Sequence, residues 1–135
     1  MTSYLRRLLI TGSRFWTDWS IPHFALAAEW YTYGPTTILV SGNCPPRPNG
    51  VPGADRICEV IWEGWGGPVE RYPANWKQYG KPAGYIRNAE MAALPGVYKC
   101  LAFSLNDSGG TANCMDEARA RNIPVSPFKL WSSAT

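Results

Sequence analysis

Metal-binding side chains are scarce in this 135-residue sequence, which has one histidine, His23, and four cysteines, none of them in a Cys-x-x-Cys pair. A structural zinc site usually needs about four Cys or His ligands at short spacings, so no metal site is expected. Cys58 and Cys114 fall in helix-like stretches and Cys100 in a strand-like one, as small buried hydrophobic residues do. Because no export signal is recognised, we expect reduced cysteines, and a disulfide pair is the minority alternative.

Long apolar runs are also absent. No segment approaches the roughly 18 apolar residues of a membrane-spanning helix. The run at 8–10 follows two arginines but is too short for the core of a signal peptide. We therefore expect a cytoplasmic protein with no membrane partner.

Charge is limited as well, with 17% charged residues and a formal net charge of +3. A nucleic-acid interface usually gathers basic residues on one face, and this balance does not by itself indicate one. A net charge of this size fits a mildly basic pocket for one phosphorylated small molecule. It fits equally well a charge that only keeps the protein soluble. The seven Trp and seven Tyr residues are compatible with core packing, base stacking or an apolar contact surface.

The sequence does contain a regular alternation of short apolar runs and amphipathic stretches. Strands are expected at 8–11, 37–40, 69–72, 97–103 and 123–125, with a helix after each of the first four. This order predicts an α/β, Rossmann-like fold of three layers, with about five parallel strands and helices on both faces. We expect one domain over residues 1–135, with its core at about 7–126, loops at 44–53 and 73–84, and an irregular tail from Ser126.

The first expected helix starts after Asp18 or Ser20 and ends before Gly34. Within it, the apolar residues recur at i, i+3, i+4 and i+7, which places them on one face: Phe24, Ala27, Ala28 and Tyr31.

The expected topology predicts where a ligand binds. In an open parallel sheet, ligands lie beyond the carboxyl ends of the strands, where the strand order reverses. Four segments should therefore converge: Gly12-Ser13-Arg14, the turn at 41–43, the start of the third helix, and Gly109-Gly110-Thr111. This convergence carries more weight than any one of the motifs.

Two glycine-containing turns have the chemistry of an anion site. In Gly12-Ser13-Arg14, glycine allows close approach, serine can donate a hydrogen bond, and arginine can bind phosphate, although Arg14 could instead pair with a surface acid. Gly109-Gly110-Thr111 precedes a helix, whose first N–H groups attract anions. The alternative is a plain helix start capped by Ser108 or Thr111. Neither turn matches G-x-G-x-x-G or a Walker A loop.

Charged residues near these turns offer further candidates. Lys81, Arg87 and Asn88 suit a phosphate or a base edge, although Arg87 could equally form a solvated i, i+3 pair with Glu90. Asp55 could bind a ribose hydroxyl or act on a substrate, but it is also the acid that a first helical turn favours.

Several segments together resemble a known family. They are Leu-Ile-Thr-Gly-Ser-Arg at 9–14, Val-Ser-Gly at 40–42, Gly-Ala-Asp-Arg at 53–56, Pro-Ala-Asn-Trp at 73–76, the run at 80–91 and Gly-Gly-Thr-Ala at 109–112. Their order is similar to that of the YspA/YpsA-related branch of the SLOG superfamily, which also contains the LOG phosphoribohydrolases and the DNA-processing protein DprA. The resemblance covers about residues 7–126.

The resemblance implies a Rossmann-like, homodimeric protein that binds a nucleotide or a nucleotide-derived ligand. It assigns 12–14 to the first ligand loop, Arg87 and Asn88 to the Arg-Asn motif of the family, and 109–111 to its phosphate-binding turn; Gly42 is a ligand-binding candidate from the topology alone. Small members of this branch occur in actinobacteria and their phages, so a phage origin is an expectation. Two departures stand out: the loop at 43–52 is longer, and Cys114 replaces the glutamate associated with catalysis in LOG enzymes.

Three functions compete at this point. The first is binding of a nucleotide-type ligand at the sheet edge, as a sensor or a sequestering protein, with no cofactor. The second is a LOG-like hydrolase that cleaves the N-glycosidic bond of nucleoside monophosphates. It needs a positioned carboxylate, for which Asp55 and Glu90 are the catalytic candidates, followed by Asp116 or Glu117. The third is single-stranded DNA binding, against which the low net charge argues.

Overall fold

Five parallel strands form one sheet in the order β3-β2-β1-β4-β5 in the computed structural model, which describes residues 5–132. The strands are β1 (Arg7–Gly12), β2 (Ile38–Ser41), β3 (Val69–Arg71), β4 (Val97–Leu105) and β5 (Val125–Leu130). In the central register, Leu9 pairs with Val40 on one side and with Cys100 on the other. The expected parallel sheet is therefore confirmed.

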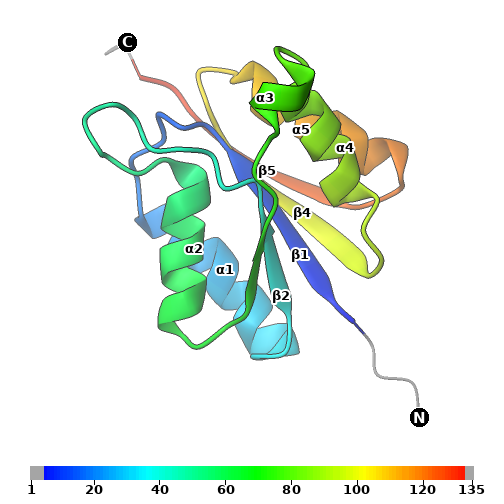
Figure 1. Ribbon diagram of the computed structural model, residues 1–135. Coiled ribbons are helices and arrows are strands. Elements are labelled where there is room, and N and C mark those ends of the chain that lie inside the picture. The colour runs from blue at the N-terminus through cyan, green and yellow to red at the C-terminus, as the bar shows by residue number, and fades with distance from the viewer. Residues whose placement is uncertain (1–4, 133–135) are drawn as a thin grey trace.

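Helices cover both faces of this sheet. They are α1 (Ser20–Tyr33), α2 (Ala54–Gly64), α3 (Trp76–Tyr79), α4 (Ala83–Ala92) and α5 (Gly109–Ala120). Figure 1 shows α1 and α2 against one face and α4 and α5 against the other. The short helix α3 lies in the segment that was expected to be a loop, where the side chain of Asn75 accepts a hydrogen bond from the backbone of Gln78. The expected three-layer Rossmann-like architecture is confirmed.

The core is divided by the sheet because alternate residues of a strand point to opposite faces. Leu8 and Ile10 of β1 pack with α1 and α2, whereas Leu9 packs with α4 and α5. Cys58, Cys100 and Cys114 are buried free thiols in these layers, as their positions predicted. No helix within residues 5–132 is long and apolar enough to cross a membrane.

The tail expected to be irregular from Ser126 is instead the edge strand β5. Its pairing with β4 continues to Leu130, and the ring of Phe128 stacks on that of Phe103 at 5.3 Å. This strand contains Pro127, which an edge strand tolerates because only one of its sides is paired.

The apolar face expected on α1 points outward. Phe24 is 72% exposed and Tyr31 is 90% exposed, while Leu26 and Glu29 are buried. Glu29 can lie inside because the hydroxyl of Tyr98 and the ammonium of Lys99 donate to its carboxylate at 2.8 and 2.9 Å. The inner face of α1 is instead formed by Leu26, with Ile21, Ala25 and Trp30 packed against the core.

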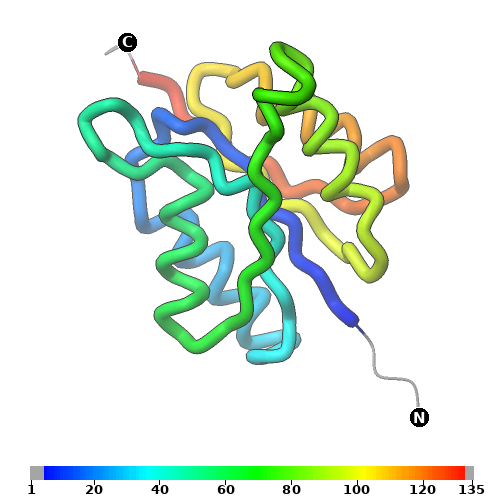
Figure 2. The backbone as a smooth tube through the Cα atoms, in the orientation of Figure 1, coloured from blue at the N-terminus to red at the C-terminus, as the bar shows by residue number. Residues whose placement is uncertain are grey.

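The segments that follow β1, β2 and β4 reach the same end of the sheet. Figure 2 shows them gathered there; the segment after β2 is the long loop that leads to α2. The strand order reverses between β1 and β4, so this end is where the topology places a ligand site.

Candidate ligand-binding site

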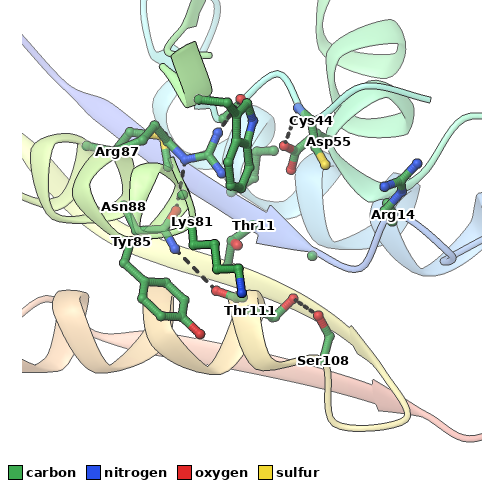
Figure 3. A pocket seen from close by; sticks show the side chains of 17 residues that line it. Thr11, Arg14, Cys44, Asp55, Lys81, Tyr85, Arg87, Asn88, Ser108 and Thr111 are labelled. Atoms are coloured by element: carbon green, nitrogen blue, oxygen red, sulfur yellow. Dashed lines mark hydrogen bonds between the residues drawn. The ribbon is translucent and has the colours of Figure 1, made fainter. Parts of the chain in front are cut away.

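A cavity of about 320 Å³ lies at this end of the sheet, and we call it the edge cavity. Its size is near the lower end of small-molecule sites, which span about 300–1,000 Å³. Most predicted site residues line it: Gly12, Arg14, Gly42, Asp55, Lys81, Arg87, Asn88, Gly110 and Thr111. Segments far apart in the sequence thus converge as the topology predicted (Figure 3).

The start of α5 provides an open, polar wall of the edge cavity. The first N–H groups of a helix have no partner within the helix and attract anions. Gly109 and Gly110 have no positive φ, and a Cβ added at either would meet no atom of residues 5–132 within 4 Å. The hydroxyl of Thr111 donates to Ser108 at 3.1 Å and closes the turn beside them. Packing within the protein therefore does not require glycine at these two positions, and the space above them is free for a ligand.

Arg87 is fixed in the cavity by backbone carbonyl groups. Its Nη1 donates to the carbonyl oxygens of Gly42 and Tyr72, and its Nε donates to the side chain of Asn88. A Cβ at Gly42 would lie 2.6 Å from Nη1, so a side chain there would displace the guanidinium. Within residues 5–132, Nη2 makes no hydrogen bond, which leaves a donor for an anion.

Asn88 joins α4 to the start of α5. It is buried, its Oδ1 accepts from Arg87 at 3.0 Å, and its Nδ2 donates to the carbonyl of Gly110 at 3.3 Å and to Asn113 at 3.0 Å. Its amide is therefore occupied by the protein. In this arrangement Asn88 sets the position of the guanidinium relative to the helix start.

Two further cations lie at the rim. Figure 3 shows Arg14 on the opposite side of the cavity from Arg87, and Lys81 extending from the segment before α4. Neither Arg14 nor Lys81 forms an ion pair within the part of the chain that the structure describes. The alternative in which Arg14 pairs with a surface acid is therefore wrong for the part of the chain that the structure describes.

Asp55 is a buried carboxyl group in the cavity wall. Its Oδ2 accepts a hydrogen bond from the backbone N–H of Cys44 at 3.0 Å. Burial raises the pKa of Asp55 to about 6, an effect that the N–H of Cys44 and the charge of Arg87 only partly oppose. A carboxyl group with this pKa can hold or release a proton near neutral pH, unlike a solvated acid of a first helical turn.

Several predicted residues are not brought into the site. Glu90 is exposed on α4 outside the edge cavity and forms no pair with Arg87, which turns inward to backbone carbonyls. The side chain of Ser13 is buried and accepts from the backbone of Phe15 at 3.0 Å, so it closes its own turn. Asp116 is exposed, and Glu117 pairs with Arg121 at 2.7 Å.

The structure also adds residues that the sequence did not indicate. Cys44 lines the edge cavity, and burial, followed by the nearby charge of Asp55, raises the pKa of its thiol. Trp76 and Tyr85 are more than half exposed and provide aromatic walls. The Pro-Ala-Asn-Trp motif contained Trp76, but nothing in the sequence indicated that a short helix would carry it to the cavity.

Comparison with known proteins gives one informative relative. The Gene 61 protein of Mycobacterium phage D29 is 40% identical over 129 residues, which cover 92% of this chain and 97% of that protein. No family model matches the sequence, and no solved structure matches it. A phage-encoded relative at this identity supports a phage origin for the chain.

Proposed function

We propose that this chain, which belongs to the family of the Gene 61 protein of Mycobacterium phage D29, binds a nucleotide or nucleotide-derived ligand in the edge cavity. One observation carries the proposal: an open helix start and a fixed guanidinium line the same cavity. Both groups favour negative charge, and a phosphate placed between them would accept hydrogen bonds from each.

The phosphate of the ligand would lie above Gly110, where the open space and the helix dipole coincide. Nη2 of Arg87 would donate to it, and the mobile charges of Lys81 and Arg14 would add long-range attraction. Asn88 would hold Arg87 and the helix start at a fixed separation, so that little ordering accompanies binding.

The remainder of the ligand would contact the aromatic and acidic walls. Trp76 and Tyr85 present ring faces suited to a base or a sugar. When ionised, the carboxylate of Asp55 could accept from a ribose hydroxyl. A volume of about 320 Å³ suits a ligand of mononucleotide size.

The SLOG resemblance supports the same site, and its catalytic departure favours binding over turnover. Cys114, at the position of the LOG glutamate, is fully buried on α5 and does not line the edge cavity. It therefore supplies no acid or base to the cavity. We propose a sensor or sequestering role, in a homodimer, and in the cytoplasm, whose reducing conditions suit the free thiols.

Calorimetry with inorganic phosphate and adenosine 5′-monophosphate tests the proposal. The unaltered protein should bind both, and Arg87→Gln should weaken binding by roughly 10–100-fold, the loss of a charge-assisted hydrogen bond. Arg121→Gln, at the far end of α5, should bind as the unaltered protein does. Absence of binding to phosphate and to a panel of mononucleotides, cyclic nucleotides and ADP-ribose would refute the proposal.

A second candidate function is hydrolysis of an N-glycosidic bond, which the raised pKa of Asp55 favours. A carboxyl group that exchanges a proton near neutral pH can assist departure of a base or activate water. Free base released from adenosine 5′-monophosphate by the unaltered protein, and not by Asp55→Asn, would support this function. No release from any common nucleotide would leave binding as the function.

A further inference from the structure

A second, larger cavity of about 810 Å³ lies beside the same turn after β1, and we call it the ring cavity. It shares no lining residue with the edge cavity. Its walls come from the turn at 13–18, the long loop between β2 and α2, and the ends of β4 and β5. The long loop thus builds a part of the molecule that the proposed nucleotide site does not use.

Two exposed aromatic side chains line the ring cavity. Phe15 is 56% exposed and Trp131 is 69% exposed, whereas Trp16 between the cavity and the core is fully buried. Open aromatic faces of this kind stack on planar rings, which remove the same apolar surface from water.

Trp131 is held in place by its neighbours. The backbone N–H of Asn106 donates to the carbonyl oxygen of Leu130 at 3.0 Å. The side-chain amide of Asn106 accepts from the backbone N–H of Ser132 at 2.9 Å and donates to its carbonyl oxygen at 3.2 Å. Asn106 adopts a positive φ of 52°, which is unusual for a residue with a side chain. The chain on either side of Trp131 is therefore fixed, and a ring can bind without ordering that segment.

Arg47 provides an unpaired hydrogen-bond donor in the wall of the ring cavity. Its guanidinium carbon lies 5.9 Å from the centre of the Phe15 ring, and its Nε donates to Val51 over a long 3.4 Å. Its Nη2 is buried and has no hydrogen-bond partner within residues 5–132. A buried unpaired donor is unfavourable, so an acceptor brought by a ligand would be recognised there after a small side-chain adjustment.

We infer that the ring cavity binds a planar heterocyclic ring with a hydrogen-bond acceptor, stacked on Phe15 or Trp131 and bonded to Arg47. A nucleobase has both properties. The phenyl ring of a partner protein would satisfy the aromatic walls but would leave the arginine unpaired. The inference does not require phosphate in the edge cavity, because the two sets of lining residues are separate.

Calorimetry with adenosine, guanosine and uridine, which carry no phosphate, tests the inference. At least one should bind the unaltered protein saturably. Trp131→Ala and Arg47→Gln should each weaken that binding at least about 10-fold, and Trp131→Phe should restore most of it. Tyr31→Ala, which removes an exposed aromatic residue elsewhere, should leave it unchanged, with melting temperatures checking that every variant folds.

Two results would overturn the inference. One is the absence of binding by all three nucleosides. The other is binding that Trp76→Ala removes and Trp131→Ala does not, because the nucleosides would then occupy the edge cavity. Phosphate binding, measured in parallel, judges the proposed function separately, so failure of one leaves the other intact.

Discussion

Gly12 and Gly110 line the same cavity for different physical reasons. A Cβ at Gly12 would lie 2.4 Å from the Cβ of Ala54 and 2.7 Å from the carbonyl oxygen of Phe103, whereas one at Gly110 would meet nothing within 4 Å. Gly53 is crowded by the backbone of Arg14 but does not line the cavity, and a Cβ at Gly42 would meet only the guanidinium of Arg87. The edge cavity therefore has a packed side at Gly12 and an open side at Gly110.

A glycine near a site is therefore not in itself a mark of ligand contact. On the packed side, the absent side chain lets β1 approach α2. On the open side, the absent side chain leaves room that no protein atom fills. Stability should respond to substitution on the packed side, and ligand affinity to substitution on the open side.

The largest expected effect concerns the buried acid on the packed side. Between pH about 4 and 6 the folded chain keeps a proton on Asp55 that the unfolded chain has released, because its pKa is raised from 3.8 to about 6. The contribution of this group to stability is full below pH about 4 and is lost as pH rises through 6, a change of about 3 kcal/mol. In denaturant unfolding, Asp55→Asn should remove this fall of the free energy of unfolding with pH. At pH 7 the variant should be more stable than the unaltered protein. The exposed Asp116→Asn should retain the fall with pH; an identical fall in Asp55→Asn would contradict the account.

Gly12→Ala should destabilise the fold by about 1–3 kcal/mol, because overpacking forces β1 away from α2. Gly64→Ala is the matched control. It lies at the end of α2 with no atom within 4 Å of an added Cβ and no positive φ, so its stability should stay equal or rise slightly. Urea unfolding measures both, and equal stabilities would remove the distinction between the two sides.

Gly110→Ala should leave stability within about 0.5 kcal/mol or raise it, since alanine favours helix. The added methyl group would enter the edge cavity, and phosphate affinity should fall by roughly 10-fold, about 1.4 kcal/mol. Unfolding and calorimetry on the same sample test the pair of effects. A loss of stability with unchanged affinity would reverse the assignment of the open side.

The smallest effect is expected at Ser13. Ser13→Ala removes one hydrogen bond to the backbone of Phe15 and should reduce stability by about 0.5–1.5 kcal/mol. Phosphate affinity should not change, because the hydroxyl is turned into its own loop. A clear loss of phosphate affinity in calorimetry would contradict this and would show that Ser13 contacts the ligand.

The sheet and the position of the cavity could be predicted because both follow from local patterns. Apolar runs alternating with amphipathic helices require a parallel sheet, and the sheet brings the strand ends together. Gly12, Arg87 and Gly110 follow strands or begin helices, so their convergence is a matter of topology. No partner residue was needed to place them.

What the sequence could not reveal depends on distant contacts. Glu29 can lie on the inner face of α1 because Tyr98 and Lys99 of β4 satisfy its charge. Arg87 forms no pair with the exposed Glu90 because its guanidinium bonds carbonyls of the segments after β2 and β3. The packed and open glycines also look alike in the sequence, since only the structure shows what a Cβ would meet.

Backbone amide chemical shifts, followed by NMR during titration with adenosine 5′-monophosphate, report directly on phosphate binding at the start of α5. Large, saturable shifts are expected for Gly109, Gly110 and Thr111, because their N–H groups would bind the phosphate. Inorganic phosphate should move the same signals, and Arg87→Gln should weaken the response. Shifts that are absent from 109–111 at saturating nucleotide, or that occur only elsewhere, would contradict phosphate binding at this helix start.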